Sequence, residues 1–103
     1  MTDQTKSPPT LDNLRARRDE ILALAERYGA YNVRVFGSVA RGEASADSDV
    51  DLLVSFREDA SLYDLSGLWQ EMQELLGCKV NIISEGGLRD RFQKRIQPDL
   101  VTL

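Results

Sequence analysis

The sequence has no histidine and only one cysteine in 103 residues. Histidine is the usual base of catalytic triads and the commonest zinc ligand, and one cysteine cannot replace it, so both kinds of site are excluded. Cys78 has no second cysteine with which to form an internal disulfide, in agreement with a reducing compartment. Any chemistry must therefore come from carboxylates, hydroxyls, lysine or arginine, or from a hard cation held by oxygen atoms.

Long apolar runs and an excess of basic residues are missing as well. No run approaches the roughly 20 apolar residues that cross a membrane, and the opening MTDQTKSPPT lacks the apolar core of a signal peptide. The 13 lysine and arginine residues against 17 acidic ones give a formal net charge of −4. Nonspecific binding to nucleic acid depends on neutralising phosphates, so an acidic chain is not expected to bind long nucleic acid. The missing apolar segments predict a cytoplasmic protein without a membrane partner.

What the sequence contains is typical of one small globular domain. Hydrophobic residues make up 42% and charged residues 29% of the chain, and this length is enough for a single modest core. Residues 1–9 are polar and end in two prolines, which predicts a disordered tail. We therefore expect a single domain over residues 10–103.

The spacing of apolar residues predicts helices that alternate with short strands. Thr10 and Asp12 are the candidates for capping the first helix, and Ser61 with Asp64 resembles a capping box. In the long helix, an apolar stripe that includes Trp69 predicts core contacts. This order predicts an α/β (α+β) fold, a small mixed β-sheet with helices packed on it. Helices are expected over 14–28, 61–76 and about 88–96, and strands over 32–36, 49–56 and 79–83.

Two short motifs lie next to the first two predicted strands. Gly37 and Ser38 follow the strand over 32–36, and a short helix is expected after them, so this turn would present backbone N–H groups and a hydroxyl to a phosphate. Asp49 and Asp51 lie on one face of the next strand, about 6.6 Å apart. Neighbouring carboxylates repel unless a cation lies between them, and oxygen ligands favour Mg²⁺ over zinc. These residues predict a phosphate-binding turn that faces a magnesium site.

Strand parity divides the rest of the segment 49–56 between two faces. Leu53 shares the face of the carboxylates. The other apolar residues, which point to the opposite face, are Val50, Leu52, Val54 and Phe56. We therefore expect one face of this strand to pack and the start of the other face to carry charge.

The motifs together resemble those of a known family. The chain contains Gly37-Ser38, ten intervening residues and Asp49-x-Asp51, together with Arg41-Gly42 and Ser48. This pattern resembles the signature of the DNA polymerase β-type nucleotidyltransferase superfamily. The small chain resembles the minimal nucleotidyltransferase (MNT) branch, which includes MntA-type antitoxins, over most of its length. The resemblance implies a polymerase β-like nucleotidyltransferase core in which Asp49 and Asp51 bind Mg²⁺. The residues that it implies for the nucleotide triphosphate are Gly37, Ser38, Arg41 and Ser48.

The sequence departs from the family at one position. Members of the superfamily carry a third carboxylate on the following strand, where it helps to hold the metal and can take the proton from the attacking hydroxyl. The matching residue here is Asn81, whose amide oxygen can coordinate a hard cation but cannot act as a general base near pH 7. Glu43, Asp47 and Glu85 are the alternatives for the missing carboxylate, although Glu85 would lie roughly 13 Å from Asn81 along an extended strand.

The resemblance implies an adenylyltransferase that uses ATP and Mg²⁺ to modify a protein hydroxyl. In the MNT branch this hydroxyl belongs to a tyrosine of a HEPN-family toxin, so the chain would be the antitoxin of a toxin–antitoxin pair and part of a hetero-oligomer. We expect the acceptor to come from the partner, because so small a chain leaves no room for an acceptor domain of the kind that aminoglycoside-modifying relatives have. Asn81 is the reason for an alternative, a catalytically degenerate binding module that neutralises its partner by complex formation. The basic residues that could contact phosphate or partner, or form a solvated helix face, are Arg41 and the cluster Arg89, Arg91, Lys94 and Arg95.

Overall fold

The computed structural model of the protein describes residues 8–85 and 99–103. Helices and strands are interspersed along the chain, which confirms the predicted α/β class. In chain order, the elements are α1 (Leu11–Ala16), α2 (Arg18–Arg27), β1 (Ala30–Phe36), α3 (Gly37–Arg41), β2 (Val50–Phe56), α4 (Leu62–Leu76), β3 (Val80–Ser84) and β4 (Val101–Thr102).

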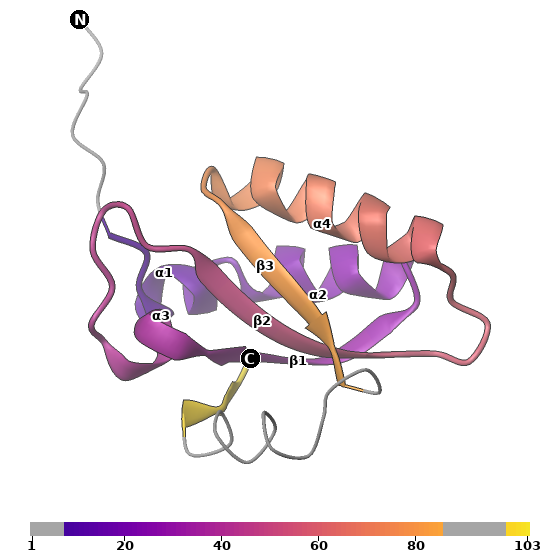
Figure 1. The fold of residues 1–103 in the computed structure, drawn as a ribbon, viewed down its shortest axis with the longest axis horizontal. Helices are drawn as coiled ribbons and strands as arrows, with labels where there is room; N and C mark the ends of the chain where they lie inside the picture. Colours follow the sequence, from indigo (N-terminus) through magenta and orange to yellow (C-terminus); the bar gives the residue numbers. More distant parts are fainter. Residues whose placement is uncertain (1–7, 86–98) are drawn as a thin grey trace, which may run out of the picture.

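The strands form one four-stranded sheet in the order β3-β2-β1-β4 (Figure 1). β1 runs antiparallel to both β2 and β4, whereas β3 runs parallel to β2. A parallel pair needs a long crossover connection, and α4 lies in the segment that supplies it. The predicted mixed sheet is therefore confirmed, with β3 as the edge strand next to β2.

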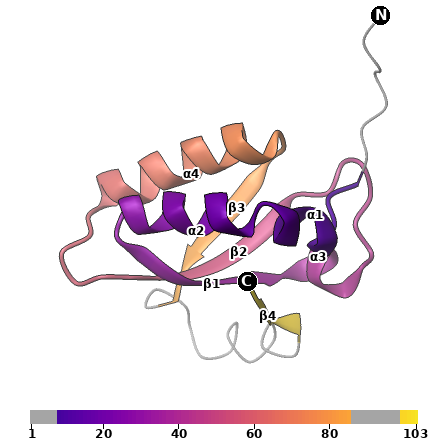
Figure 2. The ribbon, with the colours of Figure 1, turned by 180° about the vertical axis from the view of Figure 1, so that it is seen from behind.

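Helices cover one face of this sheet. α2 and α4 lie side by side on it, as both views of the ribbon show (Figures 1 and 2). The main core forms there, where residues of α2 and α4 pack against Val50, Leu52 and Val54 of β2. A smaller buried cluster contains Phe36 and Leu53, which point to the opposite face by strand parity. The predicted division of β2 between two faces is confirmed.

The helix caps follow local sequence. Ser61 and Asp64 form the predicted capping box, in which each side chain accepts a hydrogen bond from the other residue's backbone N–H. Thr10 caps α1, because its hydroxyl accepts a hydrogen bond from the N–H of Asn13 at 3.1 Å. The other candidate, Asp12, lies inside the first turn of α1, where a negative charge is favourable.

The prediction of one continuous helix over 14–28 is wrong. The chain forms two helices that are joined at Arg17, whose φ of −108° and ψ of 17° leave the helical region. The guanidinium of Arg17 donates to the backbone carbonyl of Leu75 at the end of α4, and Leu14 of α1 stays buried in the core. The break could not be predicted from sequence, because no glycine or proline marks it and it accompanies a contact with a distant element.

β1 differs from its predicted range, and β4 was not predicted. β1 begins at Ala30 and contains a bulge between Tyr31 and Arg34, where Asn32 has a φ of +53°. Asparagine tolerates this left-handed conformation better than most residues. β4 pairs with β1 over two residues, too few to produce an alternating pattern in the sequence.

Several predictions concern residues outside the described ranges. They are most of the tail over 1–9, the helix over about 88–96 and the basic cluster Arg89, Arg91, Lys94 and Arg95. Within residues 8–85 and 99–103, no helix is both long and apolar enough to cross a membrane.

Candidate functional site

The predicted motifs meet at one end of the sheet. The strand register pairs both Phe36 of β1 and Asn81 of β3 with the same residue of β2, Asp51. Asp49 directly precedes β2, and Gly37 begins α3 directly after Phe36. The phosphate-binding turn, the two carboxylates and the position of the third carboxylate are therefore neighbours, although they come from three separate segments.

Gly37 lies against the carboxylate of Asp51. Its φ is +75°, and a Cβ at this position would lie 3.3 Å from Cγ of Asp51 and less than 3.0 Å from Oδ2. Glycine is required here for both reasons, because other residues rarely adopt this conformation and their Cβ would clash. The first N–H groups of α3, those of Gly37 and Ser38, have no acceptor within a helix of this length. The turn thus places the N-terminal N–H groups of a helix beside a carboxylate, an arrangement that suits a metal-bound phosphate.

A single nitrogen atom lies within hydrogen-bonding distance of both carboxylates. Nδ2 of Asn81 donates to Oδ2 of Asp49 at 3.2 Å and to Oδ1 of Asp51 at 2.9 Å. Because the carboxylates converge on one point, both could ligate a cation there, and a turned amide would add a third oxygen. One or two carboxylates with further oxygen ligands are what Mg²⁺ takes in proteins. The donor set fits this ion, which Asp49 and Asp51 would hold.

None of the three alternative acids joins the pair as a third metal ligand. Glu43 binds the guanidinium of Arg41 at 2.7 Å, and Glu85 binds that of Arg34 at 2.9 Å. Asp47 lies in the loop before β2. Within the part of the chain that the structure describes, no three acidic or cysteine residues come together as metal ligands. The site therefore consists of two carboxylates and one amide.

Arg41, a predicted nucleotide contact, is held between two carboxylates. Its Nε donates to Glu43 at 2.7 Å and its Nη1 donates to Asp99 at 3.2 Å. These hydrogen bonds, first that of Glu43 and then that of Asp99, raise the pKa of the Arg41 guanidinium. The side chain keeps 43% of its surface exposed, so a phosphate oxygen can compete for it.

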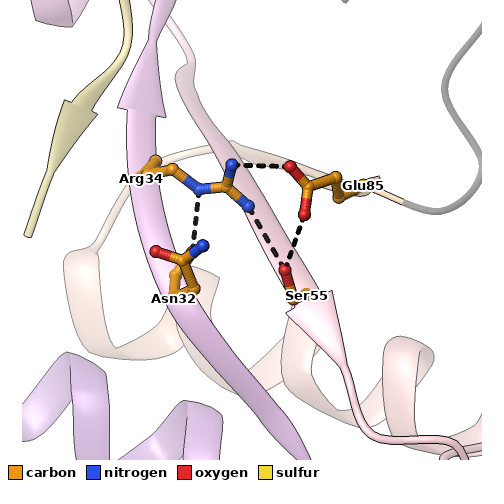
Figure 3. A network of polar contacts seen from close by, with 4 residues as sticks. All are labelled: Asn32, Arg34, Ser55 and Glu85. Atoms are coloured by element: carbon orange, nitrogen blue, oxygen red, sulfur yellow. Dashed lines mark hydrogen bonds and ion pairs between the residues drawn. The ribbon is translucent and has the colours of Figure 1, made fainter.

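A second polar cluster contains Asn32, Arg34, Ser55 and Glu85 (Figure 3). The register pairs Arg34 with Leu53, which lies on the same face of β2 as Asp51. The side chain of Arg34, only 11% exposed, donates to Glu85 at 2.9 Å, to Oγ of Ser55 at 3.3 Å and to the carbonyl of Asn32 at 3.0 Å. Ser55 also donates to Glu85 at 2.9 Å. The hydrogen bonds from Arg34 and then Ser55 lower the pKa of Glu85. No sequence pattern predicted this cluster, for which a charged residue within the β1 pattern was the only signal.

α4 fixes the start of β3 with two side chains. The prediction that Trp69 belongs to the core is wrong, because 44% of the residue is exposed. Its indole N–H donates to the carbonyl of Val80 at 2.7 Å, and the amide oxygen of Gln73 accepts from the N–H of Val80 at 3.1 Å. Val80 directly precedes Asn81 on the edge strand. Periodicity located Trp69 on the apolar stripe but could not show that its polar atom reaches another element.

A cavity of about 600 Å³ adjoins Asp49, whereas Gly37, Asp51 and Asn81 are not among its lining residues. Its lining includes Ser48 and Asp49 on the loop before β2, together with Arg17 and Lys79. The hydroxyl of Ser48, a predicted nucleotide contact, accepts a hydrogen bond from the N–H of Ser45 at 2.8 Å and closes the turn before Asp49. This volume lies within the roughly 300–1,000 Å³ of small-molecule sites.

Comparison with known proteins gives the same family as the motifs. The chain matches the model of the nucleotidyltransferase domain over residues 19–101. It is 40% identical to the protein adenylyltransferase MntA of Thermococcus cleftensis over 78 residues, which are 76% of this chain and 79% of that protein. A solved structure assigned provisionally to a minimal nucleotidyltransferase has a TM-score of 0.82 and 49% identity, covering 91% of this chain and 96% of that chain.

Two further solved structures share the fold at low identity. One is a toxin–antitoxin with AMP-PNP, with a TM-score of 0.71 and 16% identity over 82% of this chain and 69% of that chain. The other is a complex of an MNT antitoxin with a tri-AMPylated Shewanella oneidensis HEPN toxin, with a TM-score of 0.65 and 13% identity over 85% of this chain and 69% of that chain. At such identities these two show the fold alone. The family match and the relatives of higher identity show that the chain belongs to the nucleotidyltransferase domain family, in its minimal, MntA-type branch.

Proposed function

We propose that this protein is a magnesium-dependent protein adenylyltransferase that transfers AMP from ATP to a tyrosine of a HEPN-type toxin and acts as its antitoxin. The observation that carries the proposal is the convergence of the Asp49 and Asp51 carboxylates on one point beside Gly37. The relative in Thermococcus cleftensis is named a protein adenylyltransferase. The solved structures of lower identity supply the candidate substrate, through AMP-PNP, and the candidate partner, a HEPN toxin.

The proposed reaction is an in-line displacement at the α-phosphorus of ATP. The acceptor oxygen forms a bond to this phosphorus, the bond to the oxygen that bridges to the β-phosphate breaks, and pyrophosphate leaves. When bound, Mg²⁺ neutralises the charge that develops on the phosphate oxygens. Asp49 and Asp51 would hold the ion, the N–H groups of Gly37 and Ser38 would bind phosphate oxygens, and Arg41 would add a charged donor.

Asn81 bears on the choice of acceptor. Because its amide cannot take the proton of the attacking hydroxyl, that proton must pass to water. A tyrosine phenol ionises near pH 10, far more readily than the aliphatic hydroxyl of serine or threonine. A site without a general base at this position therefore favours tyrosine among protein hydroxyls.

The partner would supply the acceptor, so the working form of the protein would be a hetero-oligomer. The cavity that Asp49 lines also borders the loop before β2, and a docked partner could place its acceptor there. The single Cys78 agrees with a reducing compartment, and we place the complex in the cytoplasm on this ground.

The test is transfer of label from ATP, labelled in its α-phosphate, to the HEPN partner in the purified complex. We expect label on the partner with MgCl₂ and none with EDTA. Asp49→Asn and Asp51→Asn should each reduce it strongly, because each removes one of the two negatively charged ligands proposed for the ion. The matched control is Asp59→Asn, which removes an exposed carboxylate from the turn after β2 and should leave labelling unchanged. An unlabelled partner in the wild-type complex would contradict the proposal.

The alternative, a binding module without turnover, is favoured by one observation. Both N–H donors of the Asn81 amide engage the carboxylates, and no third carboxylate joins them in the described residues. In that case the wild-type complex would inhibit the toxin without labelling it, and Asp49→Asn would inhibit equally well. Label that appears only with Asn81→Asp would identify a catalyst that has lost its third carboxylate.

A further inference from the structure

Asn81 occupies the place between the two carboxylates that a cation would take. Its Nδ2 lies 3.2 Å from Asp49 and 2.9 Å from Asp51, and an asparagine amide has two N–H donors. Both donors are therefore used on the carboxylate pair. The register explains this position, because Asn81 is the direct neighbour of Asp51 across the parallel strands.

The backbone around Asn81 is fixed from two sides. The N–H and carbonyl of the preceding residue, Val80, bind Gln73 and Trp69 of α4, and the carbonyl of Lys79 accepts from the N–H of Val50 in β2 at 3.0 Å. Any side chain at position 81 is therefore expected to face Asp49 and Asp51. We expect a change of this side chain to alter the charge of the site and to leave the strand in place.

The charge of the side chain at position 81 affects the repulsion between Asp49 and Asp51. Two carboxylates that converge on one point repel each other, and donors directed at both of them offset the repulsion. The amide contributes those donors and no negative charge. An aspartate at position 81 would instead place a third carboxylate at the same point and would remove the donors.

We propose that Asn81 is a positioning residue that stands in for a cation, so that Asp49 and Asp51 keep their ligand arrangement, and the domain its stability, without bound metal. Rotation of the amide would then exchange nitrogen for oxygen when an ion arrives. A carboxylate at position 81 would make the stability of the fold depend on a divalent cation. The inference rests on the proposed magnesium site, and its test uses unfolding instead of adenylyl transfer, so that the failure of either can be recognised separately.

The test compares thermal unfolding of the wild type, Asn81→Ala and Asn81→Asp in EDTA and in MgCl₂ at neutral pH. In EDTA we expect Asn81→Asp to unfold roughly 5 °C below the wild type, with Asn81→Ala between them. Mg²⁺ should raise the midpoint of Asn81→Asp more than that of the wild type. Gln70→Glu adds the same charge at an exposed position of α4 and should change the midpoint little in either buffer.

A double variant separates charge number from side-chain shape. Asp49→Asn with Asn81→Asp exchanges the amide and the carboxylate and restores two negative charges, so it should recover most of the midpoint in EDTA. If Asn81→Asp does not fold in EDTA, the midpoint of the double variant in EDTA still tests the proposal. The proposal is overturned if Asn81→Asp matches the wild type in both buffers, or if the double variant in EDTA is as unstable as Asn81→Asp.

Discussion

Gly37 faces Asp51 so closely that no side chain fits between them, since a Cβ on Gly37 would lie 3.3 Å from the carboxylate carbon of Asp51 and nearer still to Oδ2. This contact joins the proposed phosphate-binding turn to a proposed metal ligand. The carboxylate is thus confined by Gly37 on one side and by the amide of Asn81 on the other. The arrangement of the site therefore depends on contacts between residues that belong to three different elements.

Gly37→Ala is expected to damage the site more than the fold. The new Cβ would displace the Asp51 carboxylate, and a misplacement of about 1 Å at a reacting centre can cost about 100-fold in rate. The measurement is the initial rate of label transfer to the HEPN partner, together with the unfolding midpoint of the variant. A transfer rate within a few-fold of the wild type would contradict the role that we assign to this contact.

Gly42→Ala is the matched control for this substitution. Gly42 has a φ of +74°, almost the same as Gly37, but a Cβ there would meet nothing within 4 Å. Both variants should therefore lose about 1 kcal/mol of unfolding free energy from the left-handed conformation. Only Gly37→Ala should also lose transfer activity.

Arg41→Ala is expected to weaken the binding of ATP with Mg²⁺. Its guanidinium has two carboxylate partners, Glu43 and Asp99, yet it remains accessible to a phosphate oxygen. Calorimetric titration should show a several-fold increase in the dissociation constant. Arg57→Ala, at an exposed position of the turn after β2, should leave the constant unchanged. Equal affinities for all three proteins would exclude Arg41 from nucleotide binding.

Trp69→Phe is expected to destabilise the domain by about 1 kcal/mol, because the carbonyl of Val80 loses its indole donor. At this chain length, such a loss lowers the unfolding midpoint by roughly 4–8 °C. Tyr63→Phe also removes one polar group from an aromatic residue of α4, but Tyr63 is 89% exposed, so it should have little effect. Equal midpoints for both variants would show that the hydrogen bond to Val80 adds no stability.

Glu85→Gln is expected to make the free energy of unfolding depend less on pH in the acid range. The hydrogen bonds from Arg34 and Ser55 hold the pKa of Glu85 below its ordinary value of 4.5 in the folded state, so ionised Glu85 stabilises the fold above that value. This contribution falls as the pH drops through the lowered pKa.

The pH prediction is tested by chemical denaturation of the wild type and Glu85→Gln between pH 7 and pH 3. Near pH 7 the wild type should be more stable by about 1 kcal/mol, a modest figure because solvent screens the half-exposed Glu85. The difference should shrink as the pH falls below 4.5 and through the lowered pKa of Glu85. Glu58→Gln, on the exposed turn after β2, should show no such convergence, and a constant difference for Glu85→Gln would exclude the ion pair as its cause.

Local rules explain why much of the fold could be predicted. α4 begins at a capping box whose two residues are three apart, and its stripe of apolar residues follows the helical period. The alternation in β2 placed Asp51 and Leu53 on one face and the remaining apolar residues on the other. In these cases the information lies within a few neighbouring residues.

The residue types and spacing of Gly37-Ser38 and Asp49-x-Asp51 alone indicated the chemistry of the candidate site, because residues i and i+2 of an extended segment share a face, and Asp49 directly precedes β2. Only the tertiary structure decided which groups these residues meet. The register of β2 with β3 brought Asn81 to both carboxylates, Glu85 was bound by Arg34, and Trp69 turned its indole to Val80. Such contacts join residues far apart in the chain, and they depend on the packing of whole elements that no local pattern records.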